Sequence, residues 1–310
     1  MCTAMLLKND NISLFGRNMD IEYSFNEHII ITPKNYPINF KKEKTINNHY
    51  QILGIGTIID NYPLYADAVN EHGLSIASLA FKDNAKYYNT KTNKINIAPY
   101  ELPLYILAKC KNIAEAINYL NNINIINTNF NENTLNTPLH FIIADKDKSI
   151  VVEQTDKLYI YDNPYNILTN NPPFNYQIEN IKSYLNLSTK NYINDSFKLN
   201  LKPNTYNHNL IGLPGDYSSK SRFIKTLLLK NNIKLENNLN DMIYHFFQIL
   251  NQVKMLKGIV ITDLGYEYTR YTSCIDLNNI TYYYQKYDDN NIYSINLKNN
   301  KRDQLSIIKL

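Results

Sequence analysis

The distribution of apolar runs along the chain is the strongest constraint on its fold. Short apolar runs bounded by polar turn residues recur in the first hundred residues and again towards the end, whereas helical spacing is concentrated in between. Runs of this kind predict strands, and apolar residues at helical spacing predict helices. Strands at both ends of a chain around a more helical middle favour an α+β layered fold in which large sheets pack together.

The predicted elements can be given as ranges. Strands are expected over residues 3–7, 12–15, 29–32, 52–59, 74–81, 139–144, 150–153, 158–161, 259–262, 268–273, 280–284 and 292–297. One helix is expected to start between Pro99 and Pro103 and to end near Lys109. Further helices are expected from Asn112 to Leu120, from Ser218 or Ser219 to Leu228, and over 242–250. The polar cluster 8–11 predicts a hairpin between the first two strands. The Asn-rich stretches 121–136 and 186–209 are predicted to be surface connections, and no linker divides the chain, which indicates one domain over residues 1–310.

Charge and cysteine usage exclude several function classes. The net charge is +4 with Lys and Arg scattered, so the basic stripe that nucleic-acid binding requires is missing. No run reaches the ~18 apolar residues of a membrane helix, and the start does not read as a signal peptide. The three cysteines form no Cys-x-x-Cys pair, and the histidines show no metal-ligand spacing. We therefore expect a reduced cytoplasmic protein without metal, cofactor, nucleic-acid or membrane partner.

Cys2 follows the initiator methionine, and removal of Met1 would leave a thiol and a free α-amine on one residue. An α-amine has a pKa of about 7.7–8.0, so part of it is unprotonated at neutral pH. A base within hydrogen-bond reach activates a thiol as a nucleophile. Cys2 is therefore a candidate N-terminal nucleophile that carries its own base, although a cysteine at this position is equally compatible with simple packing.

The charged residues Arg17 and Asp20 follow the first predicted hairpin and can return beside the first strand. Arg17 would favour the thiolate form of Cys2 by its charge. Asp20 would accept a hydrogen bond from the α-amine and orient it. The same two residues are also compatible with a solvated ion pair in a turn, which contributes little.

Several short blocks stand in a fixed order along nearly the whole chain. They are residues 1–4 (MCTA), 15–25 (FGRNMDIEYSF), 31–37 (ITPKNYP), 70–74 (NEHGL), 150–155 (IVVEQT), 168–172 (LTNNP), 212–216 (GLPGD), 221–223 (SRF) and 271–274 (YTSC). In these blocks the chain resembles the choloylglycine hydrolase family, which contains the conjugated bile salt hydrolases and the penicillin V acylases.

The resemblance implies a four-layer αββα fold of the N-terminal-nucleophile hydrolases, with the mature chain starting at Cys2. It also implies amide hydrolysis through a thioester on Cys2, with Arg17 beside the thiol and Asp20 on the α-amine. Asn170 matches the oxyanion-hole side chain of the family, and Arg222 matches its second active-site arginine. A side-chain donor aimed at a developing oxyanion is worth roughly 2.7–4 kcal/mol.

Ala80 departs from the family pattern. The bile salt hydrolases carry Asn and the penicillin V acylases carry Tyr at this place in the segment 78–81. The family uses the backbone N–H of this residue in the oxyanion hole, and Ala80 still supplies one. The departure therefore bears on substrate preference more than on activity.

The resemblance also indicates where a steroid-sized substrate would lie, in an apolar pocket with a few polar groups. The residues that match the pocket lining of the bile salt enzymes are Met19, Phe25, Ile59, Ala66, Ala80, Phe130 and Thr134. Each of the apolar ones is equally compatible with core packing. Because residues 19–25 look closer to the bile salt branch, glycine- or taurine-conjugated bile acids are the expected substrates.

Two alternatives stay open. One is another amidase specificity, for penicillin V or N-acyl homoserine lactones, which Ala80 keeps in consideration. The other is a binding protein without turnover. It is disfavoured by the joint presence of Cys2, Arg17, Asp20, Asn170 and Arg222. The resemblance further implies a homotetramer, in which the extension 186–210 would reach a neighbouring subunit.

Overall fold

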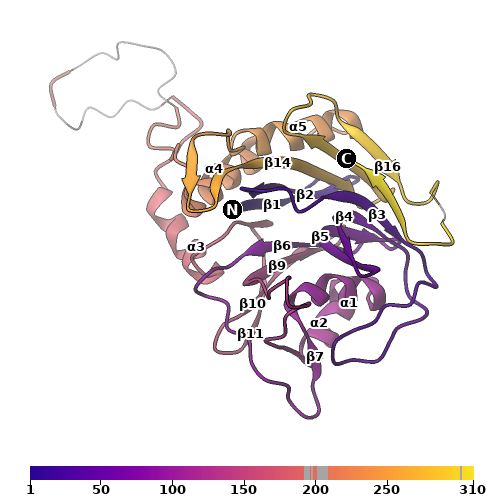
Figure 1. Ribbon diagram of the computed structural model, residues 1–310. Helices are drawn as coiled ribbons and strands as arrows, with labels where there is room; N and C mark the ends of the chain where they lie inside the picture. The colour runs from indigo at the N-terminus through magenta and orange to yellow at the C-terminus, as the bar shows by residue number, and fades with distance from the viewer. Residues whose placement is uncertain (192–195, 197, 201–208, 301) are drawn as a thin grey trace.

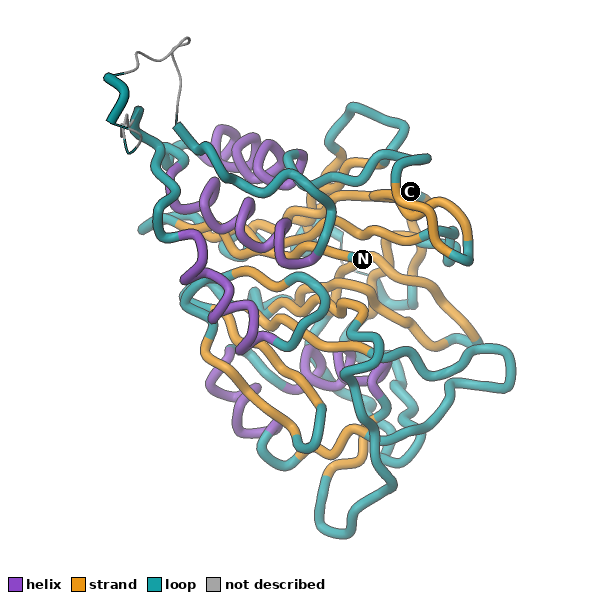
Figure 2. Tube along the Cα trace, turned by 90° about the vertical axis from the view of Figure 1, so that its left-hand side faces the viewer, coloured by secondary structure: helices purple, strands orange, loops and turns teal. Residues whose placement is uncertain are grey.

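Two sheets face each other between outer helices in the computed structural model, as Figures 1 and 2 show. The structure describes residues 1–191, 196, 198–200, 209–300 and 302–310. Helices α4 (Ser219–Asn232) and α5 (Leu239–Asn251) cover one sheet, and α1 (Leu102–Lys109) and α2 (Ile113–Leu120) lie on the side of the other. These four layers confirm the predicted αββα architecture.

The first sheet holds the start of the chain. Within the described residues it has seven strands in the order β12-β1-β2-β14-β15-β16, with β13 paired to β14. Their bounds are β12 (Ile167–Leu168), β1 (Cys2–Lys8), β2 (Ser13–Ile21), β13 (Val260–Thr262), β14 (Gly265–Asp276), β15 (Thr281–Lys286) and β16 (Tyr293–Asn296). The predicted hairpin is confirmed, because β1 and β2 pair in antiparallel register with Cys2 opposite Met19.

The second sheet has eight described strands in the order β11-β10-β9-β6-β5-β4-β3-β17. Their bounds are β11 (Leu158–Asp162), β10 (Ser149–Gln154), β9 (Leu139–Ala144), β6 (Ser75–Ala80), β5 (Tyr62–Asn70), β4 (Ile52–Ile59), β3 (His28–Thr32) and β17 (Ser306–Lys309). Gly54 in β4 permits a close approach, since a Cβ atom there would collide with the Asp67 carbonyl group and with Ala68.

The remaining elements are short. They are η1 (Pro99–Glu101), the parallel pair β7 (Ile95–Ile97) and β8 (Ile123–Ile125), α3 (Phe174–Ile181) and η2 (Lys182–Tyr184). Two predicted helix starts are confirmed: Asn112 caps α2 by accepting from Glu115 N, and Ser218 rather than Ser219 caps α4. The helix predicted from 242 begins earlier, at Leu239 after its cap Asn238.

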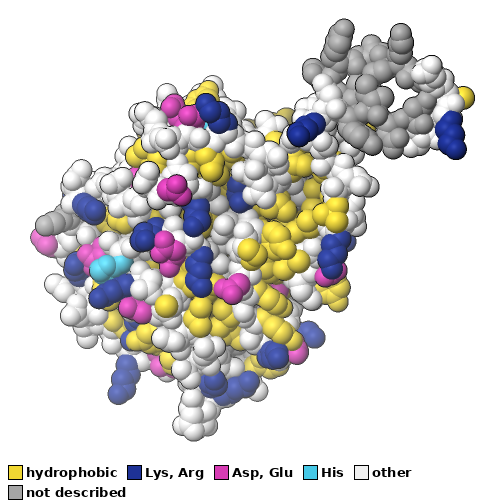
Figure 3. Space-filling view, turned by 180° about the vertical axis from the view of Figure 1, so that it is seen from behind, with side chains coloured by type: hydrophobic (Ala, Val, Ile, Leu, Met, Phe, Trp, Pro, Cys, Tyr) yellow, Lys and Arg dark blue, Asp and Glu magenta, His cyan; other side chains and the backbone are white. Residues whose placement is uncertain are grey.

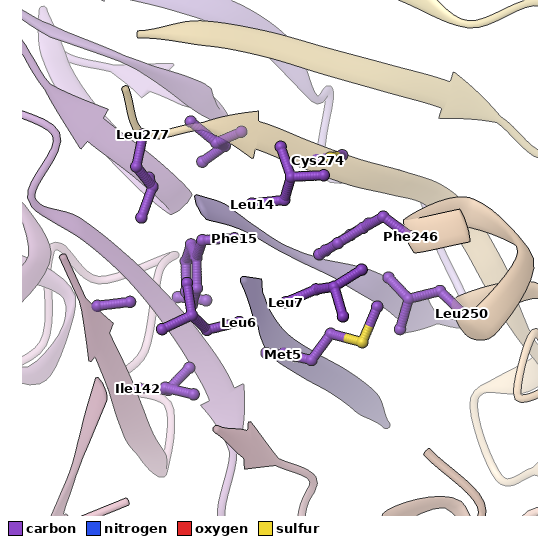
Figure 4. Close-up of a cluster of buried hydrophobic side chains, with 14 of the residues drawn as sticks. Met5, Leu6, Leu7, Leu14, Phe15, Ile142, Phe246, Leu250, Cys274 and Leu277 are labelled. Carbon is purple, nitrogen blue, oxygen red and sulfur yellow. The ribbon is translucent and has the colours of Figure 1, made fainter. Parts of the chain in front are cut away.

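The buried face of β1 explains why its sequence is a continuous apolar run. Met5 and Leu7 point towards Phe246 of α5, whereas Leu6 points the other way, towards Ile142 of the second sheet (Figure 4). Both faces of β1 are thus buried, and an unbroken apolar run is the pattern of such a strand. The nucleophile candidate therefore sits at the start of a strand packed on both sides.

Several elements escaped the sequence prediction, among them β5, α3, β12, β17 and the short pair β7 and β8. Strand β5 carries Pro63, Asp67 and Asn70, which break its apolar pattern, yet Asp67 and Asn70 are fully buried. Helix α3 starts after Pro173 without a capping side chain, and β12 and β17 are very short. The prediction of 121–136 as a surface connection was wrong in part, because β8 is buried within it. Much of the stretch 186–209 lies outside the described residues.

Three further observations concern possible partners. Across the described ranges, no helix is both long and apolar enough to cross a bilayer. In the same residues no group of three or more His, Cys, Asp or Glu side chains is placed to hold a metal ion. Basic and acidic side chains are interspersed on the face drawn in Figure 3, beside an apolar area.

Candidate active site

The β1–β2 hairpin brings the polar side chains of Arg17 and Asp20 close to Cys2. Because Cys2 pairs with Met19, their side chains lie on one face, together with that of Arg17. Arg17 donates from Nη2 to the Cys2 sulfur, and both side chains are buried. Asp20 points to the opposite face, so a thiol and an α-amine on Cys2 would have separate partners.

Arg17 bridges the two sheets. Its Nη1 donates to the carbonyl oxygens of Ala66 (3.2 Å) and Ser78, on two neighbouring strands of the second sheet. The pairing of β5 with β6 ends at Asp67 and Ala77, so the guanidinium fills the place where the ladder opens. Burial alone lowers the pKa of Arg17, but the acidic groups of Cys2, Tyr271, Asp67 and Asp20 outweigh it and raise the pKa. Arg17 is therefore a permanent cation against the thiol.

Asp20 has one carboxylate oxygen in use and one unused. Its Oδ1 accepts from Thr269 Oγ1 at 2.6 Å, whereas the buried Oδ2 has no hydrogen-bond partner among the described residues. The Met1 α-ammonium instead donates to the Asp20 carbonyl oxygen at 2.8 Å and pairs with the Glu267 carboxylate. A buried polar atom without a partner is rare and costly, which marks Oδ2 as an acceptor for a donor that unprocessed Met1 does not supply.

Asn170 and Arg222 close the site from the other side of β1. Strand β12 pairs with β1 and brings the following loop to Cys2, so that Asn170 Oδ1 accepts from Cys2 N at 2.6 Å. Arg222, in the first turns of α4, donates to the same oxygen (2.9 Å), to Thr3 Oγ1 (2.6 Å) and to the Cys2 carbonyl oxygen. Burial lowers the pKa of Arg222 below its ordinary value, and the charges of Asp20 and Cys2 offset only part of this lowering.

Ala80 lies at the end of β6 with its methyl group exposed. Its carbonyl oxygen accepts from Asn170 Nδ2 at 2.8 Å. The next residue, Phe81, donates its N–H to Pro138 across the β6–β9 ladder. Since hydrogen bonds alternate along an antiparallel strand, the N–H of Ala80 points away from β9, on the side where pairing with β5 has ended. Two donors, Ala80 N–H and the second Asn170 amide hydrogen, thus lie near each other.

The residues matched to a substrate pocket fall into groups. Met19 lies 4.0 Å by its sulfur from the Cys2 sulfur. Ile59 lies close to Phe130 and Thr134. The neighbouring residues Asn131 and Asp60 are joined by a hydrogen bond from Asn131 Nδ2 to Asp60 Oδ2, and Phe130 N donates to Thr134 O. Phe25 is half-buried and packs against the buried apolar cluster that includes Met5, Phe246 and Leu250.

Phe130 is a buried member of an aromatic cluster, which supports a packing role for it. Its ring contacts Tyr62 and Tyr100, with centroids 5.6 and 5.5 Å away. The ammonium of Lys41 lies 5.0 Å from its centroid.

Two acidic residues near the site were missed at the sequence level. Glu267 is buried on β14 and pairs with the Met1 ammonium. Asp67 is buried on β5 and accepts from the hydroxyls of Tyr271 and Ser273, each at 3.2 Å, and from Tyr282. Burial raises the pKa of Asp67, and the Arg17 charge and these hydroxyls oppose the rise. The available signal was a charged residue inside a strand pattern, which is unfavourable unless the charge is buried with partners.

Comparison with known proteins identifies the family. The family model of linear amide C–N hydrolases of the choloylglycine hydrolase family matches residues 2–309. The chain belongs to this family. The bile salt hydrolase/transferase of Lactiplantibacillus plantarum is 40% identical over 99% of the chain and 96% of its own length. A protein of the same description from Clostridium perfringens is 40% identical over 98% and 94%.

Solved structures agree with this assignment to the choloylglycine hydrolase family. The C2A mutant of the conjugated bile acid hydrolase from Clostridium perfringens superposes with a TM-score of 0.92 at 37% identity, covering 100% of this chain and 97% of that one. The penicillin V acylase from Agrobacterium tumefaciens superposes with a TM-score of 0.76 at 19% identity, covering 97% and 87%, and shows the shared fold. The predicted N-terminal-nucleophile fold and amidase class are thereby confirmed.

The loop before α4 makes a pH-dependent contribution that is testable. Asp216 accepts from Ser218 N (2.9 Å) and Ser221 Oγ (2.6 Å), and these hydrogen bonds lower its pKa to about 2. Asp216→Ala should reduce the free energy of unfolding at neutral pH by less than about 1 kcal/mol, because Asp216 is exposed and solvent screens its interactions. Because the folded pKa is depressed, the contribution is full above the ordinary value of 3.8 and is lost as the pH falls towards about 2.

Urea unfolding of parent and variant between neutral pH and pH of about 2 measures this difference. The two free energies should converge at the acid end. A difference that stays constant over the whole range would contradict the role assigned to the carboxylate.

Proposed function

We propose that this protein hydrolyses the amide bond of glycine- or taurine-conjugated bile salts, with Cys2 as its N-terminal nucleophile. The observation that carries the chemistry is that Cys2 has a separate partner on each face of the strand. Arg17 donates to the thiol sulfur, and the unpartnered Oδ2 of Asp20 lies on the other face, where it can accept from the α-amine. The substrate class rests on the bile salt hydrolases that are 40% identical over nearly the whole chain.

The reaction begins with the mature chain. Removal of Met1 frees the α-amine of Cys2, which then donates to Asp20 Oδ2 and takes the thiol proton. The Arg17 guanidinium stabilises the thiolate, which attacks the amide carbonyl carbon. Asn170 Nδ2 and the Ala80 N–H donate to the resulting oxyanion, a role that fits their closeness in the structure.

The tetrahedral intermediate then collapses. The C–N bond breaks, the α-ammonium gives its proton to the departing amino acid, and a thioester of the bile acid remains on Cys2. The amine next removes a proton from water, which attacks the thioester and releases the acid. Arg222 acts by fixing the first strand and Asn170 rather than by proton transfer, because its hydrogen bonds go to Cys2 O, Thr3 and Asn170.

The substrate side would use Met19 and Ala66 near the thiol, with Phe25, Ile59 and Thr134 farther out. Phe130 would support this wall from its buried aromatic cluster. Ala80 is the specific reason to keep a second candidate, another N-acyl amide such as penicillin V or an N-acyl homoserine lactone. Its exposed methyl group offers no side-chain hydrogen bond where the family has Asn or Tyr. A substrate that needs such a contact would bind more weakly here.

Assembly and location are part of the same proposal. We propose a single domain over residues 1–310, a homotetramer as the family resemblance implies, and a cytoplasmic location consistent with three free cysteines. Light scattering of the purified protein tests the assembly: a monomer would contradict it.

The deciding experiment measures amine released from glycocholate, taurocholate and penicillin V by the purified protein, with intact mass establishing the loss of Met1. The proposal predicts clear preference for the two bile salts. Preference for penicillin V, or inactivity of a correctly processed chain on both bile salts, would contradict the substrate assignment and point to another acyl amide.

A further inference from the structure

The two parts of the proposed oxyanion hole come from different sheets and must be held in register. Ala80 ends β6 in the second sheet, whereas Asn170 follows β12 in the first. Their direct links are few: Asn170 Nδ2 donates to Ala80 O (2.8 Å), and Asn171 Nδ2 donates to Lys82 O (2.7 Å). Arg17 ties the first sheet to β6, and Arg222 holds Asn170 Oδ1, but neither of these contacts reaches the start of α3 after the Asn170 loop. Support for that loop also matters, because catalysis by such donors depends on accurate placement.

The buried polar pair His140 and Glu153 lies next to both the end of β6 and the start of α3. His140 on β9 stands opposite Leu79 of β6, and its ring stacks on Phe81 with centroids 4.3 Å apart and planes 5° apart. His140 Nδ1 lies 2.9 Å from Glu153 Oε1, on the adjacent strand β10. The side chains of Phe81, His140 and Glu153 are all fully buried. Figure 1 shows β6, β9 and β10 side by side in this sheet.

Glu153 continues the connection to the other part of the site. Both of its carboxylate oxygens accept from Phe174 N at 3.1 Å. Phe174 begins α3, four positions after Asn170, and the side chain of the N-cap residue Pro173 has no acceptor for the N–H groups at the helix start. A carboxylate from another strand therefore caps this helix, where negative charge is favoured.

We propose that His140 and Glu153 are positioning residues that set the geometry of the oxyanion hole. The contacts run from Phe81, next to Ala80, through His140 and Glu153 to the start of α3, and so to the loop that carries Asn170. This inference rests on the proposed function. Neither residue touches the substrate or Cys2, so their loss should misplace the two oxyanion donors and leave the nucleophile unchanged.

Glu153→Gln is the primary test on the full, processed chain. The Gln side chain has one acceptor oxygen where the carboxylate has two. Its NH₂ group therefore replaces an acceptor oxygen in the contact with either His140 or the Phe174 N–H. We expect kcat for bile salt hydrolysis to fall about 10- to 100-fold while KM changes by less than about threefold. The rate of Cys2 alkylation by iodoacetamide should stay within about twofold of the parent.

Glu101→Gln is the matched control. Glu101 is also a buried carboxylate that accepts from two backbone N–H groups, those of Ala98 (2.9 Å) and Lys41 (2.7 Å), at the start of another helix. It belongs to the layer beyond the second sheet and not to the loop of Asn170. A general loss of stability would lower the activity of both variants, whereas a positioning role lowers kcat of Glu153→Gln alone.

Other outcomes overturn the inference. An unchanged kcat in folded Glu153→Gln, equal losses in both variants, or a parallel loss of Cys2 alkylation would contradict positioning. If Glu153→Gln does not fold, Phe81→Leu removes the stacking and spares the buried pair; it should show the same selective loss of kcat, and full activity would contradict the role. A parent that hydrolyses no amide overturns the proposed function itself, whereas an active parent with unaffected variants overturns only the positioning role.

Discussion

Cys2→Ala is expected to abolish turnover, with kcat lower by roughly 10⁴- to 10⁶-fold, as for removal of other catalytic nucleophiles. The variant keeps the α-amine, Arg17 and Asn170 but cannot form a thioester. Alanine removes only one sulfur atom from the buried start of β1, so the fold should persist. Release of glycine from glycocholate measures the effect on turnover. Circular dichroism of parent and variant checks that the variant is folded.

Cys110→Ala is the matched control for this experiment. Cys110 is also a buried free cysteine, and burial raises the pKa of its thiol to about 12, so it is not a thiolate at neutral pH. This variant should retain full activity per folded molecule. Substantial hydrolysis by Cys2→Ala would rule out the thioester mechanism, and loss of activity in Cys110→Ala would show that packing of a cysteine, and not its chemistry, controls turnover.

Asn170→Ala is expected to lower kcat by about 10²- to 10³-fold, equivalent to roughly 2.7–4 kcal/mol of transition-state stabilisation. The truncation removes the Nδ2 donor that lies beside Ala80 O. It also removes the oxygen that accepts from Arg222 Nη2, so a modest fall in thermal stability accompanies the change. Initial rates at saturating bile salt, with the melting temperature of each variant, separate the two effects.

Asn171→Ala provides the control because it changes the neighbouring residue in the same loop. Asn171 Nδ2 donates to the Lys82 carbonyl oxygen at 2.7 Å and contacts no part of Cys2 or Arg222 in the described hydrogen bonds. We expect kcat to fall by no more than about tenfold, because this bond helps to tie the loop to the end of β6 but supplies no donor to the oxyanion. Equal losses in the two variants would mean that the loop, and not the Asn170 amide, carries the effect.

The sequence predicted the outer frame of the fold well. Polar turns between apolar runs indicated most of the strands, and Asn112 and Ser218 marked the helix starts that the structure has. It failed where buried polar residues interrupt the pattern, as in β5 with Asp67. Such residues are stabilised by partners from distant strands, here Tyr271, Ser273 and Tyr282, which a local pattern cannot show.

The candidate site divides in the same way. Cys2, Arg17 and Asp20 lie within one hairpin, and their residue types and spacing alone suggested a nucleophile with a cation and an acceptor. Asn170 and Arg222 were indicated only by family resemblance. They reach Cys2 through the pairing of β12 with β1 and the packing of α4, at sequence separations of 168 and 220 residues.

The sequence by itself predicted an α+β layered fold and the hairpin at the N-terminus, because these follow from local apolar patterns, and it offered Cys2 as a candidate nucleophile from its position next to Met1. The αββα arrangement was implied by the family resemblance. The tertiary structure alone decided the rest. It placed Arg17 in the opening between β5 and β6, left Asp20 Oδ2 buried without a partner among the described residues, and set Glu153 beneath the Asn170 loop. These are hydrogen bonds between residues far apart in the chain, and their geometry exists only once both sheets have packed.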